Sequence, residues 1–247
     1  MDKICATTQK SKIEITAKEM SSISEKIFEL YENPKNRPLV CEFIKAVDHN
    51  IVPFTTFKNP KNQSFLWLAA YYGDIEMVRE LLKYKHDFLQ ADSTYNYTVL
   101  MSSVSGAFNS NCATIILLLL DKMNATELGV LGGYYRKKLT ALFMFLKRQL
   151  TAYNSVLIIE KFITKMSTND LKFCFDSYFA CVYFGYDDVS LAIDAGTLIQ
   201  GGPYSPNDKM RLLTLLHNKC YPSAPAATAS TATAAGTPAA STDAKPI

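Results

Sequence analysis

One segment of about 33 residues, with a polar turn and two short helix patterns, limits most strongly what this chain can fold into. The segment covers 59–92. Its first apolar pattern lies at 64–72 and its second at 74–83, with Gly73 as a break between them. A pair of short helices with a polar tip is one unit of a helical solenoid, in which each unit contacts its neighbours. The sequence therefore predicts an all-α fold built from helix pairs.

The residues of this segment resemble the ankyrin repeat. The family core T-P-L-H-x-A-A-x-x-G appears as 64–73, and the family ending I-V-x-x-L-L appears as 77–82. Ser64 can cap the first helix, the two alanines at 69–70 let neighbouring helices pack closely, and Gly73 lets the chain turn. Irregular turns are expected where the pattern changes. The departures are Phe65 for Pro, Trp67 for His and Lys85 for Gly.

Further copies of the pattern follow along the chain. The second begins at Thr98, about 34 residues after Ser64, and carries its second helix at 115–120 after an insertion at 108–111. The third begins at Thr140 and ends its pattern at 158–163. A weaker fourth copy and a degenerate unit upstream complete the series. The fourth keeps Gly185, Val189 and 192–196, and the upstream unit is 43–47.

These copies divide the chain into four parts. Residues 1–58 are an N-terminal helical extension, and 59–200 form an ankyrin-like helical-repeat solenoid. Residues 201–221 hold a cap helix that opens at Ser205, because a solenoid needs terminal units that cover its last apolar face. Residues 222–247 are almost entirely Ala, Thr, Ser and Pro, and they are predicted to be disordered because they bury too little surface to offset the entropy of ordering.

Composition argues against several classes of function. The net charge is +3, from 26 basic and 23 acidic residues, which is small for a nucleic-acid binder. No apolar run reaches the roughly 20 residues of a membrane-spanning helix, and the first residues lack the apolar run of a signal peptide. The six cysteines form no C-x-x-C pair, so we expect reduced thiols. The sequence predicts a cytoplasmic monomer with a protein partner and without cofactor, metal or nucleic acid.

The ankyrin resemblance implies protein recognition through the concave groove and the loop tips, without catalysis. In that family the two residues before the central glycine usually face the groove, and tyrosine gives a large contact area at low entropic cost. Cations at a tip and on the groove would suit an acidic partner. The alternatives are that irregular helices turn these aromatics into the core and that the tip is a solvated connector. The predicted partner-binding residues are Tyr71, Tyr72, Tyr95, Asn96, Tyr97, Arg136, Lys137, Lys147, Arg148, Tyr183 and Phe184.

Two other classes of function are kept as alternatives. An enzyme, either a transferase or a cysteine-dependent hydrolase, would use the repeats as a docking arm and would need a deep pocket near Cys174, Cys181 or Arg136. An adaptor that recruits a ubiquitin ligase would need an exposed apolar face on the helix near Ile27.

The combination of divergent repeats with an Ala/Thr/Ser tail is similar to bacterial effectors delivered into a eukaryotic host. This resemblance implies that the protein acts in the host cytosol and that residues 222–247 are read during export. A translocation reporter that is unaffected by deletion of 222–247 would contradict this hypothesis.

Overall fold

A computed structural model describes residues 17–106, 111–132, 139–148, 155–175 and 195–221. The described residues form helices joined by turns, without a strand, which confirms the all-α prediction for this part of the chain. The α-helices are α1 (Ala17–Glu32), α2 (Arg37–Ala46), α3 (Phe65–Tyr72), α4 (Ile75–Leu81), α5 (Val99–Ser105), α6 (Cys112–Lys122), α7 (Ala125–Leu128), α8 (Ala141–Lys147), α9 (Ser155–Lys165), α10 (Thr168–Phe175), α11 (Ala195–Gly201) and α12 (Pro206–Cys220). The 3-10 helices are η1 (Pro34–Asn36) and η2 (Phe54–Thr56).

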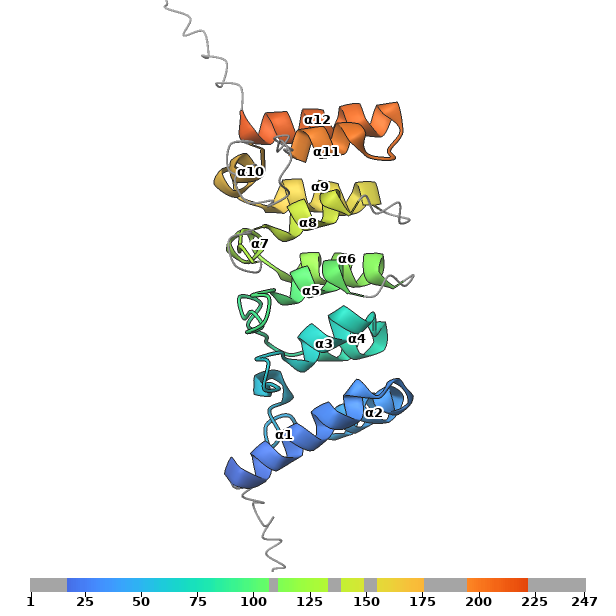
Figure 1. The fold of residues 1–247 in the computed structure, drawn as a ribbon, viewed down its shortest axis with the longest axis vertical. Coiled ribbons are helices and arrows are strands. Elements are labelled where there is room, and N and C mark those ends of the chain that lie inside the picture. Colours follow the sequence, from blue (N-terminus) through green and yellow to red (C-terminus); the bar gives the residue numbers. More distant parts are fainter. Residues whose placement is uncertain (1–16, 107–110, 133–138, 149–154, 176–194, 222–247) are drawn as a thin grey trace, which may run out of the picture.

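The helices are arranged as successive layers along the long axis of the molecule. Figure 1 shows α1 and α2 at one end, α11 and α12 at the other, and the pairs α3–α4, α5–α6 and α8–α9 between them. Two rows of contacts run through these layers. In the first-helix row α3 contacts α5, α5 contacts α8, and α8 contacts α11. In the second-helix row α4 contacts α6, α6 contacts α9, and α9 contacts α12.

Each of the helices α3, α5 and α8 starts after a hydroxyl residue that caps it. The side chains of Ser64, Thr98 and Thr140 accept hydrogen bonds from main-chain N–H groups three residues later, at 3.1, 3.5 and 3.2 Å. These bonds satisfy N–H groups that have no partner within the helix. The predicted cap at Ser64 is confirmed, and α5 and α8 begin where the second and third copies were expected to begin.

The turns before α3 and α5 also share a feature. Asn62 and Asn96, each two residues before a cap, have left-handed backbone angles with φ of 60° and 54°, a region that asparagine tolerates better than most residues. Gly73 ends α3 with φ of 73°, as its place in the pattern predicted. Each tip closes with an isolated antiparallel bridge. The bridges are Lys58 to Ser64, Ala91 to Thr98 and Gly132 to Leu139.

The core is continuous from the first layer to the last, with Ile27 at one end and Cys220 at the other. Ala69 and Ala70 of α3 are fully buried, as expected for small residues between layers. Gly106, directly after α5, lies close to α3, because an added Cβ there would lie 2.1 Å from the main-chain oxygen of Tyr71. Small residues therefore bring α3 and α5 into close contact.

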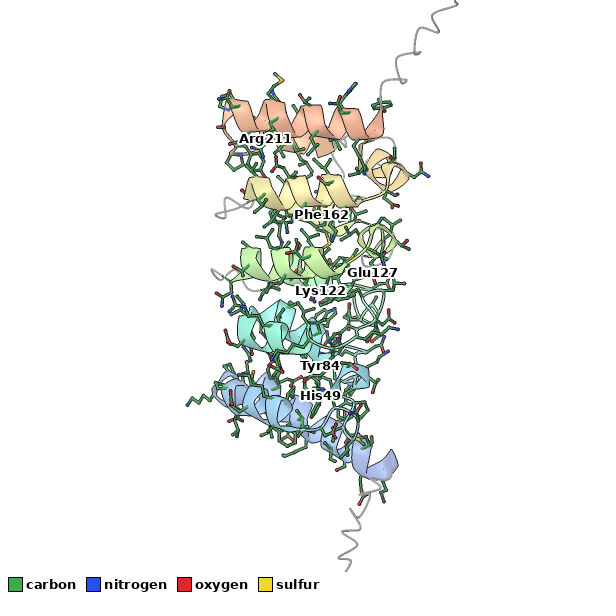
Figure 2. All side chains as sticks on the ribbon, turned by 180° about the vertical axis from the view of Figure 1, so that it is seen from behind. His49, Tyr84, Lys122, Glu127, Phe162 and Arg211 are labelled. Atoms are coloured by element: carbon green, nitrogen blue, oxygen red, sulfur yellow. The ribbon has the colours of Figure 1, made fainter. Side chains whose placement is uncertain are left out.

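The N-terminal layer repeats features of the α3–α4 layer. His49 Nε2 lies 3.0 Å from the carbonyl oxygen of Ile44 at the end of α2, and His86 Nε2 lies 2.7 Å from that of Leu81 at the end of α4. His49 also stacks on Tyr84 at 3.7 Å, and Figure 2 shows this pair between the first two layers. Helix α2 thus has the same kind of ending as α4, which it contacts.

The last layer differs from the sequence expectation. Most of the predicted fourth copy, including Gly185 and Val189, lies outside the described residues. Ala195 and Gly196 were expected to end that copy, but they begin α11. Helix α11 contacts α8 and α12, and its Ile199 is buried. The cap helix α12 begins as predicted, with Ser205 accepting a hydrogen bond from the N–H of Asp208 at 3.1 Å.

Candidate protein-binding surface

A buried carboxylate organises the tip at 91–98. Asp92 is 2% exposed, and its carboxylate accepts hydrogen bonds from the main-chain N–H groups of Thr94, Tyr95 and Tyr97 at 3.0, 3.0 and 2.7 Å. Three such bonds to one ionised group fix the path of the turn. The tip is therefore a preformed loop that holds Tyr95 in the open, with 49% of its surface exposed.

Four aromatic side chains connect this tip to the end of α3. Tyr95 stacks on Tyr97, with ring centroids 5.6 Å apart. The Trp67 indole N–H donates to the Tyr97 carbonyl at 2.8 Å, and the Trp67 ring stacks on Tyr71 at 5.4 Å. Tyr71 is 36% exposed, Tyr97 is half-buried and Trp67 is buried. We call these four residues the aromatic band; its two exposed rings rest on its two more buried ones.

Tyr97 links the band to two charges. Burial raises the pKa of the Tyr97 hydroxyl, the positive charge of Arg148 opposes this rise, and the negative charge of Asp92 adds to it. The hydroxyl therefore stays protonated at neutral pH and can donate a hydrogen bond. The charge of Arg148 acts on this part of the band although α5, α6, α7 and α8 lie between Tyr97 and Arg148 in the chain.

Tyr72 packs toward the N-terminal layer. The Arg37 guanidinium lies 3.8 Å from the centre of the Tyr72 ring, and the Tyr31 ring meets it edge-on at 6.3 Å. Burial raises the pKa of Tyr72, with Glu32 adding to the rise and Arg37 opposing it. The tyrosine lines a groove of about 530 Å³ beside α2 together with Arg37 and Cys41. The Tyr72 ring also meets the Tyr71 ring edge-on, with centroids 5.4 Å apart, so Tyr72 joins the aromatic band to the N-terminal layer.

The two predicted cations on α8 differ in what they contact. Arg148 donates to the main-chain carbonyls of Val104 and Ser105 at 2.6 and 2.9 Å, so its guanidinium holds the last turn of α5. Lys147 is exposed at the end of α8. The sequence assigned both to a partner, whereas the contacts of Arg148 also give it a structural role. The other cations predicted for this strip, Arg136 and Lys137, lie outside the described residues.

Neighbouring tips are joined by hydrogen bonds. The Ser93 N–H donates to the Lys61 carbonyl at 2.9 Å, and the Asn62 side-chain amide donates to the Ala91 carbonyl at 2.7 Å. The amide of Asn96 points toward the Leu131 carbonyl in the next tip, at 3.5 Å. These contacts place the exposed Lys58 and Lys61 of tip 57–64 beside tip 91–98. Sequence reasoning missed these lysines, although they flank the turn before the first repeat helix.

The remaining predicted residues are those of the fourth copy and of the two alternative functions. Tyr183 and Phe184 lie outside the described residues, as does Cys181, and the side chain of Cys174 is not described. Ile27 is buried against the core, so α1 has no exposed apolar face at the position that the adaptor hypothesis requires. Within the described ranges, no cluster of three or more His, Cys, Asp or Glu side chains could hold a metal ion.

A further exposed apolar pair lies on α2. Leu39 and Phe43, one helical turn apart, are 67% and 44% exposed.

No described helix is long and apolar enough to cross a bilayer. Comparison of the chain with protein-family models, with curated proteins and with solved structures gives no match.

Proposed function

We propose that this chain is a protein-binding module of divergent ankyrin-like repeats, and that it binds its partner through the aromatic band. The recurring features support the repeat assignment: a hydroxyl cap and a closing bridge occur at the start of α3, α5 and α8, and a left-handed asparagine lies two residues before the caps of α3 and α5. The ordered contacts in both rows support a stacked arrangement of these units.

The exposure of Tyr95 and Tyr71 is the observation that carries the binding proposal. Apolar rings cost free energy when they remain in water, and burying them against a partner recovers roughly 25 cal/mol per Å² of apolar surface. Here the rings are held outward by fixed neighbours, Asp92 beneath the tip and Trp67 beneath Tyr71. A surface that is already ordered loses less conformational entropy when it binds. Tyrosine and tryptophan are also the residues most enriched at energetic centres of interfaces.

Affinity capture tests this proposal with two matched double variants. Tyr71→Ala/Tyr95→Ala removes the exposed rings of the band, and Leu39→Ala/Phe43→Ala removes a comparable exposed apolar pair on α2. The full chain is immobilised, and captured proteins are quantified by mass spectrometry after circular dichroism has shown that each variant is folded. For proteins that the wild type captures, we expect the captured amount to fall at least about tenfold with the band variant and to stay unchanged with the α2 variant. Equal capture by all three forms, or loss only with the α2 variant, would contradict the proposal.

Delivery into a host cell is a separate proposal. It rests on residues 222–247, which lie outside the described residues, and the translocation reporter tests it independently of the binding surface.

A further inference from the structure

We infer that the partner presents an acidic, extended segment, which lies across tips 57–64 and 91–98 with its carboxylates at Lys58 and Lys61 and an apolar side chain on Tyr95. This inference rests on the proposed function and names the chemistry of the partner. It follows from the distribution of charge over the described surface and from the hydrogen bonds that join the two tips.

Ion pairs occur on one part of the described surface. They lie on α1, on α2 and along α4, and they join α6 to α9 and α9 to α12. The ion pairs of the described residues therefore belong to the N-terminal layer and to the second-helix row. In those places the cations have carboxylates of the chain itself as neighbours, which reduces their attraction for an outside anion.

The tips and the first-helix row have a different charge pattern. Helices α3 and α5 contain no charged residue. Lys58 and Lys61 are exposed, and neither makes an ion pair with a described residue. The carboxylates of nearby tips are engaged locally, since Asp92 accepts from its own turn and Glu127 accepts from the N–H of Asn124 at 2.7 Å. Lys58 and Lys61 are thus exposed positive charges outside the ion pairs of the described residues, and the nearby Asp92 carboxylate is buried within its own turn.

The tip contacts place these lysines next to an apolar contact. The Lys61 carbonyl accepts from Ser93, two residues before Tyr95, so the two tips form adjoining parts of one edge. Figure 1 shows the tips following one another along the side of the stack. A linear edge suits an extended chain, in which alternate side chains can reach a lysine and a ring. Two lysines are too few to bind the phosphates of a nucleic acid strongly, and the net charge of the chain is only +3. An acidic peptide segment is therefore favoured over a nucleic acid as the partner.

The test measures binding of labelled peptides to the full chain by fluorescence anisotropy. One peptide of about 12 residues alternates Glu or Asp with Leu or Phe, and its control carries Gln or Asn in place of each acid. A single-stranded oligonucleotide of similar length is the third probe. We expect the acidic peptide to bind at least about tenfold more tightly than its control, and to weaken when NaCl rises from about 50 to about 300 mM.

Two charge-reversal variants locate the site. Lys58→Glu/Lys61→Glu should weaken binding of the acidic peptide at least about tenfold, because the new carboxylates repel those of the peptide. Lys35→Glu/Lys122→Glu makes the same charge change on η1 and on α6, where Lys122 is labelled in Figure 2, and should alter binding by less than about twofold. Tyr95→Ala should weaken binding of both peptides. Tyr221→Ala removes an exposed tyrosine at the far end of the stack and is the control, which should leave binding unchanged.

The inference is overturned if the two peptides bind equally, if neither binds, if both lysine variants act alike, or if the oligonucleotide binds more tightly than the acidic peptide. In each case the capture experiment still reports on the proposed function. Partner capture that depends on Tyr71 and Tyr95 without selectivity for acidic peptides would keep the binding module and reject the acidic partner.

Discussion

Arg148, directly after α8, donates a hydrogen bond to the main-chain carbonyl of Val104 in α5, with 2.6 Å between the atoms. The same kind of contact occurs in the second-helix row, where Lys165 of α9 and Lys219 of α12 donate to carbonyls in the last turns of α6 and α9. The last carbonyls of a helix lack partners within the helix and carry partial negative charge. A cation in one layer therefore satisfies the helix end of the layer before it.

Replacing Arg148 with Gln should lower the free energy of unfolding by about 1 kcal/mol, because the last turn of α5 loses a charged donor. Urea denaturation followed by circular dichroism measures this change. Lys122→Gln, on the exposed side of α6, is the control and should change stability by less than about 0.5 kcal/mol. Unchanged stability together with lost partner capture would instead make Arg148 a binding residue alone.

Gly106→Ala should destabilise the fold by about 1–3 kcal/mol, since the new methyl group has no room. The added Cβ would lie 2.1 Å from the Tyr71 oxygen, a main-chain atom that cannot move without shifting α3. The backbone at Gly106 has φ of −67°, which alanine adopts readily, so the effect comes from packing alone. Gly201→Ala, at the end of α11, is the matched control because nothing lies within 4 Å of its added Cβ. Equal midpoints of thermal unfolding for the two variants would refute the close approach of α3 and α5.

Asp92→Ala should open the tip at 91–98, because three main-chain N–H groups lose the carboxylate that they share. Limited proteolysis with chymotrypsin measures this opening, through the rate of cleavage after Tyr95 and Tyr97. We expect cleavage to accelerate at least about tenfold, since a loop released from its hydrogen bonds reaches the protease more often. Thr94→Ala, in the same exposed turn, keeps the carboxylate and should be cleaved at the wild-type rate.

The fold should be less stable in mild acid, because the half-buried His86 takes up a proton less readily than it does in the unfolded chain. Burial lowers the pKa of His86 below its usual value of 6.5, although its hydrogen bond to the Leu81 carbonyl partly opposes this. The unfolded chain therefore takes up a proton before the folded chain as pH falls below about 6.5, and the free energy of unfolding decreases. The stabilisation is complete above that pH and is lost as pH falls toward the folded pKa. Urea titrations at about pH 7.5 and about pH 5 should show a smaller loss for His86→Gln than for the wild type. Equal losses in both proteins would argue against this contribution from His86.

The sequence alone determined the local structure of the first repeat. Ser64 caps α3 and Gly73 ends it, because a hydroxyl acceptor and a residue without a side chain are needed at those positions whatever the helix packs against. The starts of α5, α8 and α12 follow from the same capping chemistry at Thr98, Thr140 and Ser205. Tyr71 and Tyr95, which the sequence predicts as partner-binding residues, are both exposed.

Only the tertiary structure decided what these side chains contact. Arg148 holds the end of α5, Tyr72 lies beneath Arg37, and Lys61 adjoins the tip that carries Tyr95. Each of these contacts joins residues far apart in the chain. Hydrogen-bond donors and aromatic rings have the same local pattern whether they meet solvent, a partner or a neighbouring layer. Capping depends on residues within one turn and can be read from the sequence, whereas contacts between layers depend on how the helices pack.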